Sequence, residues 1–69
     1  MNDLNQYSSK IAQLIDETIN DCIACGYARN TRDGLTVEAE WDQNGRDIMV
    51  CLSKDGRILA DWLEKGVQA

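Results

Sequence analysis

The spacing of apolar residues changes once along this chain, and that change limits the fold more than any other feature. Up to Cys25 the apolar residues recur with the period of an α-helix, and from Leu35 they alternate with polar residues as in a half-buried β-strand. The pattern predicts a helix over about residues 3–25 and strands over about residues 35–42, 47–53 and 57–64. We therefore expect an α+β fold in which one N-terminal amphipathic helix packs on a three-stranded antiparallel β-meander (αβββ).

The predicted helix has one broad apolar stripe, and its opposite side is charged or polar. At about 100° per residue the stripe contains Leu4, Tyr7, Ile11, Leu14, Ile15, Thr18, Ile19, Cys22 and Cys25. Gly26 follows directly, and glycine readily adopts the left-handed conformation that ends a helix. We interpret residues 26–34 as a polar connection to the first strand.

Two turn dipeptides set the expected register of the strands. A two-residue turn at Asn44-Gly45 gives three apolar pairs: Trp41 with Ile48, Ala39 with Val50 and Val37 with Leu52. After Asp55-Gly56, a three-residue loop with Gly56 as a bulge residue pairs Leu52 with Ile58, Val50 with Ala60 and Ile48 with Trp62. One face of the sheet is then apolar throughout, with both tryptophans in the core. The pattern leaves open whether Ile58–Lys65 is a strand or a short helix.

The same register predicts an unusual outer face, on the side of the sheet away from the helix. Its centre is apolar (Met49, Cys51, Leu59 and Leu63) and its surround is acidic. An apolar patch rimmed by charge is typical of an interaction site. The expected partner-binding residues are Glu38, Glu40, Asp42, Asp47, Met49, Leu59, Asp61 and Leu63. Because alternate strand residues lie about 6.6 Å apart, Glu38, Glu40 and Asp42 should form a regular row of negative charge.

The charge of the chain indicates what kind of partner this face would bind. The 69 residues are enough for a single domain spanning 1–69, and they carry a net charge of −5. Phosphate contacts need Lys and Arg, so an acidic domain favours a basic protein over direct contact with nucleic acid. No apolar run approaches the roughly 18 residues of a membrane span, and Met1–Gln6 lacks the features of a signal peptide. We expect a cytoplasmic protein with no membrane partner.

Catalytic chemistry has little support in the sequence. Cys22-Ile23-Ala24-Cys25 is a C-x-x-C at a helix C-terminus, where the helix dipole disfavours a thiolate. Three cysteines without histidine do not supply the four ligands of a zinc site. We interpret Cys22 and Cys25 as core residues, and a thiol or metal protein that uses them, with or without Cys51, as an alternative. We expect no enzyme, no catalytic residue, no metal and no cofactor.

Two families resemble this chain. The order of strands and turns over Leu35–Gly66, with Asn44-Gly45 and Asp55-Gly56 as the turns, resembles a PepSY-type module, which also places a helix on an antiparallel meander. The size, the acidity and the row Glu38, Glu40, Asp42 and Asp47 are similar to phage-encoded anti-CRISPR proteins. That resemblance implies a non-catalytic inhibitor, working in the cytoplasm of the host cell, that occupies a DNA-binding surface.

These observations predict a non-enzymatic inhibitor or adaptor whose acidic sheet face docks onto a basic surface, such as that of a nucleic-acid-binding effector complex, and blocks it. A structural or adaptor domain that homodimerises through the outer face is the alternative, so both a monomer and a homodimer remain open. The sequence assigns no role to Arg29 and Arg32.

Overall fold

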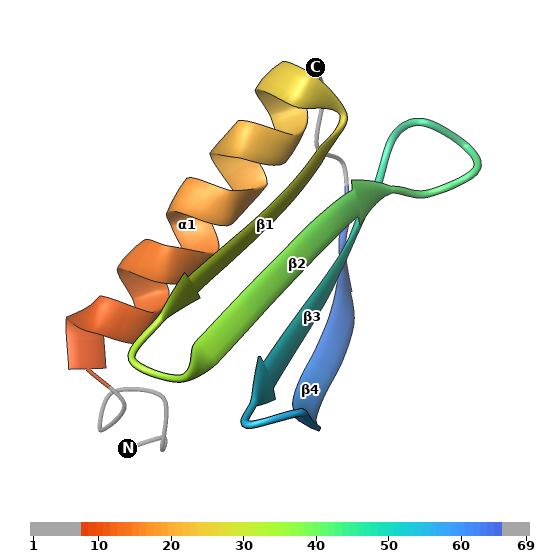
Figure 1. Ribbon diagram of the computed structural model, residues 1–69. Helices are drawn as coiled ribbons and strands as arrows, with labels where there is room; N and C mark the ends of the chain where they lie inside the picture. The colour runs from red at the N-terminus through yellow and green to blue at the C-terminus, as the bar shows by residue number, and fades with distance from the viewer. Residues whose placement is uncertain (1–7, 66–69) are drawn as a thin grey trace.

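The computed structural model describes residues 8–65 and shows one helix and one antiparallel sheet (Figure 1). The elements are α1 (Ser8–Cys25), β1 (Tyr27–Arg32), β2 (Leu35–Trp41), β3 (Ile48–Lys54) and β4 (Arg57–Glu64), and the sheet order is β1-β2-β3-β4. The predicted α+β class is confirmed, but the sheet has four strands rather than three. The expected first turn of the helix, residues 3–7, lies outside the described residues.

The strand missing from the prediction is β1, which was interpreted as a polar connection. Only Ala28 of its six residues is buried, so it lacks the alternation of apolar residues that marks β2. It is held by backbone pairing with β2, from Tyr27 opposite Glu40 to Arg32 opposite Leu35. Asp33 and Gly34 both have positive φ, 55° and 81°, as a two-residue hairpin turn requires. The Asp-Gly dipeptide was therefore the available signal for this hairpin.

The predicted pairing of β2 with β3 is confirmed, although the turn between them is wider than expected. Trp41 lies opposite Ile48, Ala39 opposite Val50 and Val37 opposite Leu52. Beyond the strands, the Asp42 amide donates to the Asp47 carbonyl (2.8 Å), and the Gly45 amide donates back to the Asp42 carbonyl (2.9 Å). Asp42 and Asp47 therefore lie in the connection, one residue outside strands that were predicted to include them.

The predicted register of β3 with β4 is wrong, and a β-bulge explains the error. Asp55 and Gly56 have φ of 51° and 83° and form a two-residue turn, so that Lys54 lies opposite Arg57 and Ser53 opposite Ile58. A shift at Leu52/Ser53 then places Ala60 opposite Leu52 and Trp62 opposite Val50. One extra residue restores the phase of the apolar face, so Ala60 and Trp62 still face the helix side as predicted. The segment is a strand and not a short helix.

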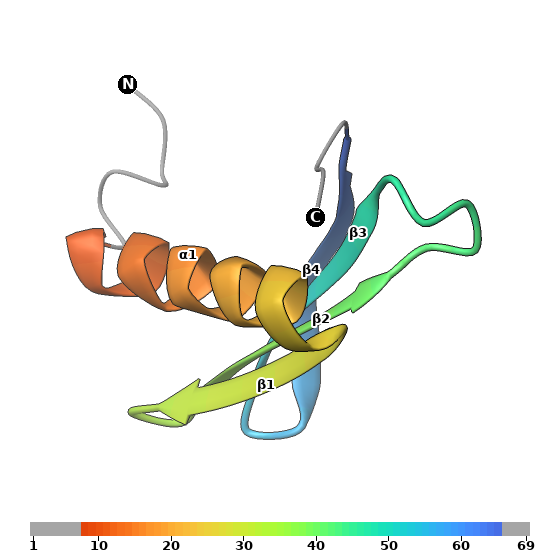
Figure 2. The same ribbon diagram turned by 90° about the horizontal axis from the view of Figure 1, so that it is seen from above.

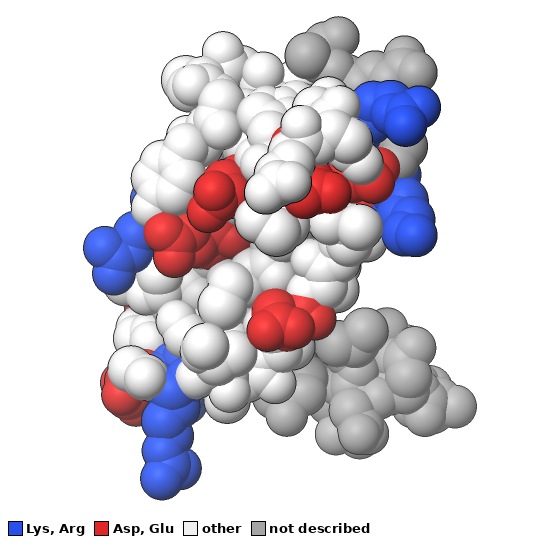
Figure 3. All heavy atoms as spheres, turned by 90° about the vertical axis from the view of Figure 1, so that its right-hand side faces the viewer, with Lys and Arg blue, Asp and Glu red and all other residues white. Residues whose placement is uncertain are grey.

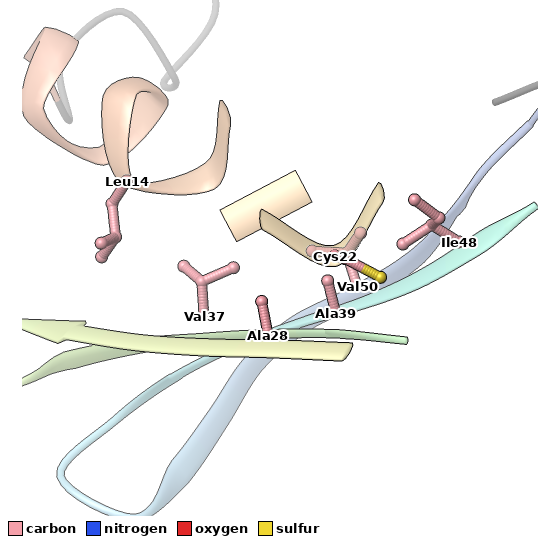
Figure 4. Packing of buried hydrophobic residues seen from close by; sticks show 7 residues of the cluster. All are labelled: Leu14, Cys22, Ala28, Val37, Ala39, Ile48 and Val50. Atoms are coloured by element: carbon pink, nitrogen blue, oxygen red, sulfur yellow. The ribbon is translucent and has the colours of Figure 1, made fainter. Parts of the chain in front are cut away.

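The core lies between α1 and the first three strands. Its buried residues are Leu14 and Cys22 from α1, Ala28 from β1, Val37 and Ala39 from β2, and Ile48 and Val50 from β3 (Figure 4). The two tryptophans are half-buried and pack against this cluster. Seen from above, α1 lies over β1 and β2, while β3 and β4 turn away at one side (Figure 2).

Polar contacts attach β1 to the helix. The fully buried Thr18 hydroxyl donates to the Leu14 carbonyl (2.7 Å) and accepts from the Asn30 side-chain amide (2.9 Å). Arg32 forms an ion pair with Glu17 on α1 (3.0 Å), which gives Arg32 a role in holding β1 against the helix. Gly26 ends the helix with φ of 92°, as its position predicts.

Candidate functional site

The outer face of the sheet is built from rows of residues that run across all four strands. One row contains Tyr27, Glu40, Met49 and Leu63, and the next contains Arg29, Glu38, Cys51 and Asp61. Direct cross-strand neighbours have Cβ atoms about 4.5–5.5 Å apart, so these side chains are in reach of one another. The two rows place carboxylates beside an apolar strip formed by Met49 and Leu63.

The structure brings most of the predicted site residues together. An open groove of about 410 Å³ lies on the outer face, over β2, β3 and β4. Of the predicted residues, it is lined by Glu38, Glu40, Met49, Asp61 and Leu63. Cys51 lies on the groove floor between Glu38 and Asp61, because it is the direct partner of both. We call this groove and its rim the acidic face.

Three predicted residues lie elsewhere. Leu59 was expected at the centre of the outer face, but it lines a different groove, on the helix side, together with Ile11 and Ile15. The bulge is the reason, because Ile58 takes the position opposite Ser53 on the outer face and Leu59 becomes the extra residue. Asp42 and Asp47 flank the β2–β3 connection and do not line the acidic groove, and Asp47 accepts a hydrogen bond from the Asn44 side chain (3.2 Å).

The carboxylates of the acidic face are not equivalent. Glu38 is half-buried and accepts a hydrogen bond from the Tyr27 hydroxyl, and this hydrogen bond raises the pKa of Tyr27 above its ordinary value. Arg29, directly opposite Glu38 in the register, adds a positive charge at this edge. Glu40 and Asp61 are exposed, and neither makes a hydrogen bond or ion pair with any residue between 8 and 65. These two carboxylates are the ones available to a partner.

Sequence reasoning missed the contribution of β1 to this face. Tyr27, about half exposed at 48%, and Arg29 extend the face by one strand, so the row of glutamates lies inside the sheet rather than at its edge. Viewed from the side away from α1, Asp and Glu side chains lie across the middle of the molecule and Lys and Arg lie at its margins (Figure 3).

The three cysteines have different environments. Cys22 is fully buried in the core, as predicted, and burial raises the pKa of its thiol, with smaller contributions from Glu40 and Cys25. Cys25 was also expected in the core but is exposed, because it is the last residue of α1, where the chain leaves the helix through Gly26. Cys51 is half-buried. No three Cys, Asp or Glu side chains within residues 8–65 lie close enough together to hold a metal ion.

This arrangement predicts an order of thiol reactivity. With a small aromatic disulfide reagent at neutral pH, we expect Cys25 to react first, Cys51 more slowly, and Cys22 only as the domain unfolds, because accessibility and thiolate formation both limit the reaction. The labelled positions can be read by mass spectrometry of the intact and digested chain. Rapid labelling of Cys22 in the folded protein would contradict the core assignment.

Comparison with protein-family models, with curated proteins and with solved structures finds no match to this chain. Over residues 8–65 no helix is both long enough and apolar enough to cross a membrane.

Proposed function

We propose that this chain is a non-enzymatic binding protein whose acidic face docks onto a basic surface of a partner protein. The observation that carries the proposal is the pairing of exposed, unengaged carboxylates at Glu40 and Asp61 with the apolar strip of Met49 and Leu63 beside them. Charge alone is common on soluble proteins. Charge arranged around exposed apolar side chains is the arrangement of an interface, with a desolvated centre and a polar rim.

The chemistry of the face matches lysine and arginine side chains. Both have an apolar stem and a charged end, so a stem can lie on Met49 and Leu63 while its end pairs with Glu40 or Asp61. A surface that carries several such side chains is typical of proteins that bind nucleic acid. Occupying that surface would block it, which is inhibition of the anti-CRISPR type. In this proposal the protein acts in the cytoplasm, in the host cell if it is phage-encoded.

The alternative of a homodimer through the same face is disfavoured by charge. A two-fold contact places the same patch of both copies together, so Glu40 and Asp61 of one copy would approach those of the other. Like charges brought together in a partly desolvated interface cost free energy. A partner of opposite charge meets no such cost.

A charge-reversal pair tests the proposal. The chain with Glu40→Lys and Asp61→Lys is compared with a control that carries Asp16→Lys and Asp21→Lys, two exposed positions on α1. Both variants change the net charge by the same amount. Asn30 keeps its hydrogen bond to Thr18 when Asp21 is replaced, so the control should remain folded.

The measurement is capture of proteins from host lysate at low salt, followed by mass spectrometry and by binding to the purified protein. We expect a basic protein to be retained by the original chain and by the α1 control, lost by the acidic-face variant, and released as salt rises. The captured basic protein should also release bound nucleic acid when the original chain is added. Equal retention by the folded acidic-face variant would exclude the acidic face as the docking surface.

A further inference from the structure

A second apolar surface lies on the other side of the sheet, beside the helix. It is a groove of about 680 Å³ between α1 and β4, which we call the trough. Ile11 and Ile15 of α1 form one wall, Leu59 and Trp62 of β4 form the other, and Leu35 and Leu52 lie between them. Leu59 is 55% exposed, so the trough presents apolar side-chain area to solvent.

The trough exists because one helix is too narrow for this sheet. Strands lie about 4.8 Å apart and a helix with its side chains is about 10 Å wide, so one helix covers about two strands. Accordingly α1 packs on β1 and β2 and leaves β4 and part of β3 without a helix above them, as Figure 2 shows. Within residues 8–65 nothing else covers this half of the face. The space beside α1 has the width of one more helix, and layered α+β folds bury a sheet face under such elements.

Charge at one end of the trough indicates what that helix carries. Lys54 lines the trough and lies directly opposite Arg57 across the hairpin, where two like charges cost stability. Neither side chain makes a hydrogen bond or ion pair with any other described residue. Toward the far end, Glu64 already accepts a hydrogen bond from the Trp62 indole (2.8 Å). The trough thus offers one unengaged cationic end and an apolar body.

We propose that the trough binds an amphipathic helix of a partner protein, laid beside α1. Its apolar stripe, with anchors at positions i, i+3 or i+4 and i+7, packs against Ile15, Leu52 and Leu59. Acidic side chains at one end of that helix pair with Lys54 and Arg57. This surface is opposite the acidic face, so the chain can hold a basic surface on one side and a helix on the other.

The test uses the full chain and synthetic peptides of about four helical turns. The first peptide has a leucine stripe and glutamates at one end, the second has lysines in place of those glutamates, and the third has the composition of the first with its stripe scrambled. Binding is followed by NMR of the isotope-labelled chain. Leu52, Leu59 and Ala60 report on the trough, and Met49 and Leu63 report on the acidic face.

We expect the first peptide to move the trough signals, the second to bind about threefold to tenfold more weakly, and the scrambled peptide not to bind. Leu59→Glu should lower the affinity of the chain for the first peptide by about tenfold or more, because it places a charge in the apolar contact. Its neighbour Ile58→Glu is the matched control, since Ile58 is similarly exposed but lies on the outer face. Binding to Ile58→Glu should stay within about twofold.

Three outcomes would overturn the proposal. Trough signals that stay unmoved by the first peptide at millimolar concentration exclude a helix site. Trough signals that move with dodecanoate and not with the peptide assign the trough to a small amphiphile. If the trough signals move when only the protein concentration is raised, and sedimentation shows a dimer, the trough binds a second copy of the chain.

Discussion

Leu14→Ala is expected to remove most of the free energy of unfolding of this domain. Leu14 is only 2% exposed and projects from α1 toward the sheet, beside Val37 in the core cluster (Figure 4). Removing a buried leucine side chain to Cβ costs about 2–5 kcal/mol, from lost transfer free energy and from the cavity that remains. A domain of this size has a total stability of only about 3–5 kcal/mol from its core, so the substitution removes most of it.

Urea denaturation followed by circular dichroism measures the effect. The matched control is Leu59→Ala, which removes the same atoms from a position that is 55% exposed, and we expect it to cost less than about 1 kcal/mol. If both variants lose the same free energy of unfolding, Leu14 is not packed in the core as Figure 4 shows it.

Met49→Ala is expected to cause the largest loss of partner binding of any single truncation on the acidic face. Met49 lies between Glu40 and Leu63 in one cross-strand row and is 43% exposed, so it offers adaptable apolar area at the centre of the groove. An anchor of this kind contributes about 2 kcal/mol or more to binding, which corresponds to about a 30-fold change in the dissociation constant.

Ile58→Ala is the control for that prediction. Ile58 is more exposed, at 67%, and also lies on the outer face, but it sits opposite Ser53 and does not line the groove. Truncating it should change the dissociation constant by less than about threefold. Calorimetry with the purified partner compares the two variants. A larger loss at Ile58 than at Met49 would move the binding centre away from the groove.

The sequence predicts the positions of residues that lie in a clear helical stripe or beside a clear turn dipeptide. The helix stripe predicted Leu14, Thr18 and Cys22 as a buried row, and the Asn44-Gly45 hairpin predicted the pairing of β2 with β3. Local periodicity and turn chemistry are sufficient there because each is a property of consecutive residues. Five of the eight predicted site residues consequently line one groove.

The rest depended on contacts that consecutive residues do not encode. β1 has almost no apolar pattern, and its strand conformation comes from pairing with β2 and from the contacts of Asn30 and Arg32 with α1. The β3–β4 bulge is a compromise between two local preferences, a two-residue Asp-Gly turn and an apolar helix-side face. The sequence prediction kept the apolar face and replaced the two-residue turn with a three-residue loop. It therefore placed Leu59 on the outer face, whereas Leu59 lines the trough.

The proposed function requires that the partner bind at the acidic face. The most direct measurement is NMR of the isotope-labelled chain as the purified basic partner is added, which reports every backbone amide at once. We predict that the largest shifts fall on Glu40, Met49, Asp61 and Leu63 and diminish as salt is raised. Shifts confined to Asp16 and its neighbours on α1, or to the trough around Leu52, with the acidic face unchanged, would show that the partner binds elsewhere.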